Sequence, residues 1–200
     1  MQETGYFIIL KKVKYSEADL IITALSNKGE KKSFLARSAL KSKKRFGGGV
    51  FEPTHYVKLT FTNKEEKNQL NTLEEAQLIN DFYNLRKDYD ILEFALHAVD
   101  CILRVSQEGV QDSEALYNLL GHSLKNLNKE NLIKTSDLLI LKLQFYLKFL
   151  SEQGVLSLES WMLPYLQQSL SAHEKLRERI ETDKINMSVI ESTIEHYIRQ

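Results

Sequence analysis

The stretch HYVKLTFTN, residues 55–63, alternates between apolar and polar side chains. Val57, Leu59 and Phe61 share one face of an extended chain, and the more polar residues between them share the other face. Strict alternation over this length is typical of a β-strand with one buried face. The stretch therefore predicts a strand on the surface of a small β-domain.

Four further runs surround this strand and have the composition of strands. They are GYFIILKKVK (5–14), DLIITALS (19–26), KKSFLAR (31–37) and a weaker run, NQLNTL (68–73). Gly29 closes a short turn between the second and third runs. Five short strands with one long, glycine-containing connection after the third are typical of a barrel of the OB type. An SH3-like barrel or a small sandwich would show the same periodicity.

After Thr72 the apolar residues recur at helical spacing. The predicted helices cover residues 73–86, 92–103, 113–127, 138–150 and 158–170, and a capping box at 188–191 opens a last helix. The helix over 138–150 has so wide an apolar stripe that we expect it at the centre of a bundle, with Gly154 just past its end. The predicted class is α+β: a five-stranded OB-fold β-barrel over residues 1–76, followed by an α-helical bundle domain over 77–200.

The formal net charge is zero, with 27 Lys and Arg against 27 Asp and Glu, but the two signs are segregated along the chain. Through Thr72 there are 14 basic and 7 acidic residues, and from Leu73 onward there are 13 basic and 20 acidic residues. A basic strand-rich segment joined to an acidic helical segment indicates two units with different surface roles.

Several kinds of chemistry are excluded by the order and spacing of residues. The stretch KSKKRFGGGVFEP, 41–53, has its cations before its glycines and no Lys-Ser/Thr after them, unlike an NTPase phosphate loop. The histidines are scattered, and the single Cys101 lies in an apolar helical context that predicts a buried thiol. Glu17 and Asp19 fall in a turn, where we expect hydrogen bonds rather than a metal. Nothing indicates an enzyme or a cofactor, and no apolar run could span a membrane.

Cationic side chains recur on the first predicted strand, around the third, and in the connection after it. The expected nucleic-acid contacts are Lys11, Lys12, Lys14, Lys31, Lys32, Arg37, Lys41, Lys43, Lys44 and Arg45. The four cations of 41–45 repel one another, and their arrangement makes sense beside a polyanion. We expect the three glycines at 47–49 to give this connection the freedom of a mobile segment that grips phosphates.

Single-strand binders combine a cationic groove with aromatic rings on which bases stack. Phe46 and Tyr56 are the candidate stacking residues, followed by Tyr6 and Phe34, and burial inside a small barrel is the competing interpretation for each ring. An RNA-binding OB-fold protein would show the same electrostatic pattern. A protein-interaction adaptor that uses the acidic half, without nucleic-acid binding, is a third alternative.

Residues 8–61 resemble the N-terminal domain of the RecO recombination mediators of bacteria. The similar features come in order: a polar turn at 15–20 (YSEADL), a strand ending at 27–29 (NKG), LAR at 35–37 running into a Lys/Arg-Ser cluster, and GVFEP at 49–53. No single feature is specific, but the ordered set is. The helical remainder is similar in architecture.

The resemblance implies an OB-fold domain and an α-helical domain in a non-catalytic DNA-binding protein of the bacterial cytoplasm, associated with the nucleoid. Members of the family bind single- and double-stranded DNA, anneal complementary strands and, with RecR, help to load RecA onto DNA coated by single-strand-binding protein (SSB). The expected partners are therefore DNA, RecR, the C-terminal tail of SSB and, indirectly, RecA. Many members carry a four-cysteine zinc motif in the helical part, and the single cysteine here predicts no zinc.

Overall fold

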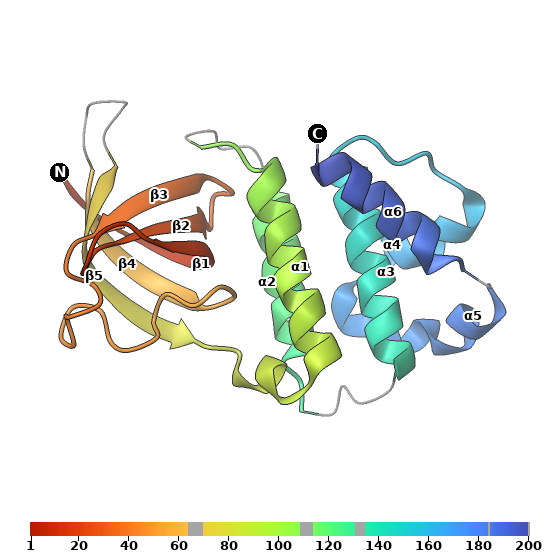
Figure 1. The fold of residues 1–200 in the computed structure, drawn as a ribbon. Helices are drawn as coiled ribbons and strands as arrows, with labels where there is room; N and C mark the ends of the chain where they lie inside the picture. The colour runs from red at the N-terminus through yellow and green to blue at the C-terminus, as the bar shows by residue number, and fades with distance from the viewer. Residues whose placement is uncertain (64–69, 109–113, 131–134, 184, 200) are drawn as a thin grey trace. The chain divides into compact units, whose positions relative to one another are not determined.

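The structure, a computed structural model, describes residues 1–63, 70–108, 114–130, 135–183 and 185–199. The chain divides into two units. The barrel unit comprises Met1–Phe82 and Val105–Tyr117, and the helical unit comprises Tyr83–Arg104 and Asn118–Gln200. All the strands belong to the barrel unit, and α3 to α6 belong to the helical unit (Figure 1).

Five strands close into a barrel in the order β1-β2-β3-β5-β4. Their bounds are β1 Gln2–Lys14, β2 Leu20–Ser26, β3 Lys31–Ala36, β4 Tyr56–Thr62 and β5 Asn71–Asn80. Neighbours are antiparallel, except that β3 and β5 pair in parallel through residues 34–35 and 71–72. The α+β class, with five N-terminal strands followed by helices, is confirmed. The closure of the sheet on itself excludes a two-sheet sandwich.

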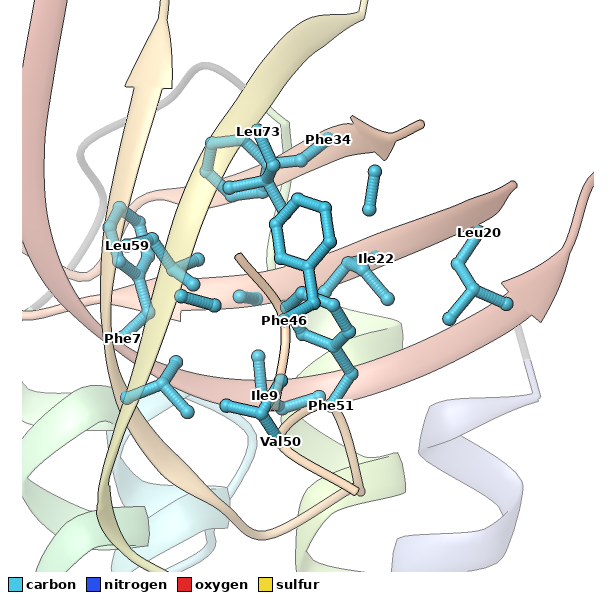
Figure 2. Packing of buried hydrophobic residues seen from close by; sticks show 14 of the residues in the cluster. Phe7, Ile9, Leu20, Ile22, Phe34, Phe46, Val50, Phe51, Leu59 and Leu73 are labelled. Atoms are coloured by element: carbon cyan, nitrogen blue, oxygen red, sulfur yellow. The ribbon is translucent and has the colours of Figure 1, made fainter. Parts of the chain in front are cut away.

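The alternation predicted for β4 is confirmed, since Val57, Leu59 and Phe61 are buried and their neighbours are partly exposed. The rings of Phe7, Phe34 and Phe61 meet edge to face, with centroids 5.0–6.0 Å apart. Figure 2 shows side chains from all five strands converging on this core. Aromatic packing of this kind fills a small barrel with few residues.

The centre of β1 is continuously apolar because the strand contains a bulge. Ile9 lies opposite Ala24 and Lys11 opposite Thr23, so Leu10 is an extra residue with no partner on β2. Beyond the bulge Lys12 and Lys14 lie opposite the buried residues of β2. Paired residues share a face of the sheet, so these two lysines take the inward side at the end of the barrel.

The helix predicted over residues 73–86 is wrong: most of that range is β5, and the rest contains the 3-10 helix η1 (Tyr83–Lys87). The misleading signal was the spacing of three between Leu73 and Ala76, the buried residues of β5. Phe61 pairs with Leu73 and Thr60 with Glu75, so Glu74 is a bulge residue. This extra residue brings Leu73 and Ala76 to the same face of the strand. Buried residues three positions apart in the sequence are also typical of a helix, so the spacing was misleading.

The predicted boundary at residue 76 lies inside β5, whose pairing with β4 continues to Asn80. The fifth strand predicted around residues 68–73 begins within that run, at Asn71, while residues 68–69 lie outside the described part of the chain.

The helical unit is organised around α3. The helices and 3-10 turns after η1 are α1 Tyr89–Val105, α2 Glu114–Leu127, α3 Thr135–Glu152, η2 Ser160–Met162, α4 Leu163–Gln167, η3 Leu170–Leu176, α5 Arg177–Thr182 and α6 Met187–Ile198. As predicted from its wide apolar stripe, α3 packs against several neighbours: α4, α5, α6 and η3. Gly154, with φ 69°, follows the end of α3, and Val155 N–H donates to the Leu150 carbonyl at 3.1 Å.

Two details of the predicted helices are corrected. In α1 the helical spacing of Leu92, Leu96, Val99 and Leu103 predicts one buried stripe, but Leu96 is 41% exposed. Phe94, Ala98 and Cys101 lie on the buried side instead. The capping box predicted at 188–191 is wrong, because α6 begins at Met187 and residue 188 is already helical. The apolar residues of α1 occupy more than one face, so its sequence alone did not show which face packs.

A buried carboxylate of the helical unit is balanced by a guanidinium of the same unit. Arg177 of α5 donates to both carboxylate oxygens of Asp137 on α3, at 2.7 and 2.8 Å. The Asp137 side chain is 2% exposed.

Cys101 is buried as predicted, and burial raises the pKa of its thiol to about 12. No helix within the described ranges is long and apolar enough to cross a bilayer.

Candidate nucleic-acid interface

The long connection between β3 and β4, residues 37–55, is called the mouth loop here because its second half closes one end of the barrel. Phe46, Val50 and Phe51 are buried in the barrel core, and the rings of Phe46 and Phe51 lie 5.4 Å apart (Figure 2). Ala76 N–H of β5 donates to the Arg45 carbonyl at 3.0 Å. Buried side chains therefore anchor the loop in the core on both sides of the three exposed glycines.

Only one of the three consecutive glycines has a backbone conformation that favours glycine. Gly49 has φ 78°, in the left-handed region, whereas Gly47 and Gly48 do not have positive φ values. A Cβ atom at any of the three would meet no atom within 4 Å. Turn hydrogen bonds run from Val50 N–H to the Gly47 carbonyl and from Glu52 N–H to the Gly49 carbonyl, at 3.1 and 3.4 Å.

The first half of the mouth loop is tied to the turn between β1 and β2. Asp19 Oδ1 accepts a hydrogen bond from Ser38 N–H at 2.7 Å, and the Ala18 carbonyl accepts one from Leu40 N–H at 3.0 Å. Ser16 Oγ accepts a bond from Asp19 N–H at 3.3 Å, within the turn itself. Asp19 therefore has the turn-forming role that the sequence predicts, and it also positions the mouth loop.

Two of the predicted cations hold this structure together. Lys12 forms an ion pair with Glu52 of the mouth loop. Arg45 donates from Nη2 to the Arg37 carbonyl at 2.9 Å, and its guanidinium lies 5.0 Å from the centroid of the Phe46 ring. Both side chains fix the loop, so they are less available to an incoming phosphate than their neighbours.

Five other predicted cations form what we call the mouth cluster. They are Lys14, Arg37, Lys41, Lys43 and Lys44, and all are exposed. Within the described part of the chain their side chains have no hydrogen-bond or ion-pair partner. Lys14 pairs with Leu20, and Leu20 pairs with Ala36, so Lys14 and the residue before Arg37 lie in one row across β1, β2 and β3, about 10 Å apart. Lys11 is also exposed and lies on the opposite face of β1 from Lys12.

The structure does not bring Lys31 and Lys32 into this cluster. Both lie at the start of β3, beside the turn between β2 and β3, whereas Arg37 follows the end of β3. Six residues of strand separate the two ends by about 17 Å. Lys32 is also paired with Glu30 at 3.2 Å and lies over the Phe61 ring at 5.5 Å. The ten predicted cations therefore do not form a single patch.

The predicted stacking residues differ in their exposure to solvent. Phe46 and Phe34 are 3% and 0% exposed and belong to the core, so neither offers a face to a base. Tyr56 is partly exposed and stacks on Tyr6, with centroids 5.9 Å apart and an interplanar angle of 26°. Burial and a hydrogen bond with Tyr56 raise the pKa of the Tyr117 hydroxyl. The sequence could not show that Phe46 is buried, because a base-stacking ring on the surface would have the same cation-rich neighbours in the sequence.

The exposed cations of the mouth are the kind of groups that contact the phosphates of a polyanion. Exposed ammonium and guanidinium groups project from a loop whose backbone is held at both ends. No group of three or more His, Cys, Asp or Glu side chains that could hold a metal occurs among the described residues. Sequence reasoning missed the residues that position the cations, Glu52 and the Asp19–Ser38 contact, because such pairings appear only in three dimensions.

Comparison with known proteins gives a consistent result. The family model described as "Recombination protein O N terminal" matches residues 1–82. A protein of Desulfatibacillum aliphaticivorans named DNA repair protein RecO is 30% identical over 148 residues, which is 74% of this chain and 55% of that protein. The protein of the same name from Syntrophus aciditrophicus is 34% identical over 142 residues, 69% of this chain and 54% of its own length.

A third relative, the DNA repair protein RecO of Thermodesulfovibrio yellowstonii, is 30% identical over 129 residues, which is 63% of this chain and 50% of that protein. The chain thus spans about half the length of the curated relatives it matches. These matches are longer than the 82 residues of the family model, so the similarity is not confined to the barrel.

Proposed function

The chain belongs to the RecO family, and on that premise we propose that it is a non-catalytic, DNA-binding mediator of recombinational repair. The barrel is then an OB fold whose mouth holds the DNA backbone. The proposal assigns DNA binding to the barrel, expected over residues 1–76 and continuing to Asn80 in β5, and protein contacts to the helical part expected over 77–200. The mediator acts in the bacterial cytoplasm, at the nucleoid.

The observation that carries the proposal is the mouth cluster. Five exposed cations without side-chain partners in the described structure gather at one end of a barrel, while Lys12 and Arg45 hold the underlying loop. Unpaired like charges at one place raise the local potential and attract a polyanion. Contacts to phosphates give affinity without sequence preference, which suits a protein that must act on any damaged strand.

The finer role follows from the family. We propose that the chain binds single- and double-stranded DNA, anneals complementary strands, and acts with RecR to help load RecA onto SSB-coated single-stranded DNA. The DNA-binding step is assigned to the barrel, and contact with the C-terminal tail of SSB to the helical unit. DNA recombination and repair after DNA damage are the processes that the names of the relatives support.

The test is the triple variant Lys41→Ala/Lys43→Ala/Lys44→Ala, which spares the anchoring Arg45. We expect the unchanged chain to bind a mixed-sequence single strand with a Kd between nanomolar and micromolar at about 50 mM salt. The variant should bind more weakly, and the slope of log K against log salt should fall by about 0.7 for each phosphate that the variant no longer neutralises. Fluorescence anisotropy at several salt concentrations measures both quantities.

The matched control is Lys125→Ala/Lys129→Ala/Lys175→Ala, which removes the same charge from exposed positions of the helical unit. Its affinity should stay close to that of the unchanged chain. Equal weakening in the two triple variants would show that the mouth is not the binding surface. Competition with RNA of matched sequence tests the RNA-binding alternative, since a preference for RNA requires contacts to the 2′-hydroxyl.

A further inference from the structure

The mouth of the barrel carries exposed apolar side chains as well as cations. Tyr15 is 65% exposed and Leu40 is 54% exposed. They come from two separate places in the sequence, the β1 end with its turn and the first half of the mouth loop. Neither of them belongs to the barrel core, and exposed apolar residues that gather at one site indicate a binding surface.

Backbone hydrogen bonds hold these two places together. Leu40 N–H donates to the Ala18 carbonyl at 3.0 Å, and Tyr15 N–H donates to the Asp19 carbonyl at 3.0 Å. Asp19 in turn accepts the Ser38 N–H at 2.7 Å. Tyr15 and Leu40 are therefore displayed from a turn and a loop that fix each other, so a ligand would find the surface already formed.

The charges around this surface select its ligand. Tyr15 directly follows Lys14, and Leu40 directly precedes Lys41, and both lysines belong to the mouth cluster. An exposed aromatic ring on the turn that adjoins these cations fits a strand whose phosphates contact the cations while an unpaired base lies on the ring. A paired duplex keeps its bases stacked inside, so it could use the cations but not the ring.

We propose that Tyr15 is the base-stacking residue of the mouth, with Leu40 as its apolar neighbour, and that it recognises single-stranded DNA. This inference rests on the proposed function and names the feature that distinguishes single strands from duplexes. Tyr15 takes the role that the sequence assigns to Phe46, which is buried. The partly exposed Tyr56 is already stacked on Tyr6 and is less suited to receive a base.

The variant Tyr15→Ala tests the proposal in the 200-residue chain, with a labelled oligothymidylate and an abasic strand of the same length as probes. Stacking on an aromatic ring is worth about 1–3 kcal/mol per base, so Tyr15→Ala should weaken oligothymidylate binding roughly five- to 150-fold. Binding of the abasic strand, which has phosphates but no bases, should not change. Tyr15→Phe keeps the ring and should keep the affinity.

Tyr89→Ala is the matched control, since Tyr89 is 76% exposed and lies in the helical unit. It should leave both probes unaffected. If Tyr15→Ala binds oligothymidylate as tightly as the unchanged chain, the stacking role is refuted while the phosphate contacts of the mouth stand. Equal weakening toward both probes also refutes stacking. If the unchanged chain binds neither probe, the proposed function itself has failed.

A spectroscopic readout checks the contact directly. The chain has one tryptophan, Trp161, so Tyr15→Trp in a Trp161→Phe background places the only indole at the mouth. Oligothymidylate should quench its fluorescence, whereas the abasic strand should quench it much less. Equal quenching by both strands would refute a base lying on the ring.

Discussion

Gly49 shows how a single backbone angle gives one member of a glycine run its importance. Its φ of 78° lies in a region that side chains with a Cβ rarely adopt, although space for a Cβ is available there. The other two glycines of the run, Gly47 and Gly48, also have space for a Cβ, but their φ values are not positive. Steric clashes are therefore absent at all three positions, and only the backbone preference distinguishes them.

We expect Gly49→Ala to destabilise the chain by about 1 kcal/mol, the cost of a left-handed backbone for a residue with a Cβ. For a chain of this size that destabilisation lowers Tm by about 2–4 °C. The control Gly48→Ala should leave Tm unchanged or slightly raised, because it only removes freedom from the unfolded chain. Thermal unfolding followed by circular dichroism measures both variants. Equal shifts would contradict the role given to the Gly49 backbone.

At the scale of residues, the sequence predicts the type of site better than it predicts which residues form the site. The cations of residues 41–45 and the turn at Asp19 could be identified from composition and spacing. Which lysine is paired and which aromatic ring is buried depended on contacts between distant residues, as for Lys12 with Glu52 and Phe46 with Phe51. Tyr15 carries no sequence signal that separates it from any other exposed tyrosine.

At the scale of elements, β5 shows how tertiary pairing overrides a local pattern. Its sequence has helical spacing, yet it pairs with β4 along its length and with β3 at its start. The bulge at Glu74 reconciles the spacing with a strand. The clean alternation of β4 and the wide stripe of α3 were predictable because each of these patterns fits only one kind of packing.

The ion pair between α3 and α5 offers a test at the same scale. Arg177→Ala would leave the Asp137 carboxylate, 2% exposed, without the guanidinium that balances its charge. We expect a clear decrease in the free energy of unfolding, measured by urea denaturation, because the carboxylate that loses its partner is buried. The control Arg104→Ala breaks an exposed pair with Asp100 on α1 and should decrease it much less. Decreases of similar size in both variants would contradict the structural role of the buried pair.

At the scale of the whole molecule, the neutral net charge conceals a basic segment, through Thr72, and an acidic remainder. The six acidic residues at 73–82 and 105–117 belong to the barrel unit, so its basic excess is confined to the first 72 residues. The proposed mediator role needs two kinds of surface, one that holds DNA and another that engages proteins. Composition indicates this division, whereas the partners come only through the family.

A strand-annealing assay on SSB-coated complementary DNA tests both surfaces at once. The chain should accelerate annealing of coated strands, and the triple variant at Lys41, Lys43 and Lys44 should slow it because DNA binding is weakened. The helical-unit triple variant serves as the charge-matched control. Acceleration on naked strands without any on coated strands would leave DNA binding intact but contradict the mediator role.

The pairing of β1 with β4 has a consequence for the order in which the barrel folds. Gln2 lies opposite Thr62, so the first half of β1 cannot complete its hydrogen bonds until some sixty residues have left the ribosome. The meander of β1, β2 and β3 can form earlier from local contacts. At roughly 5–20 residues per second the delay from the end of β2 to the end of β4 is a few seconds. The first half of β1, which is unpaired until β4 is made, begins with Gln2, Glu3 and Thr4. These polar residues discourage aggregation through the unpaired strand edge.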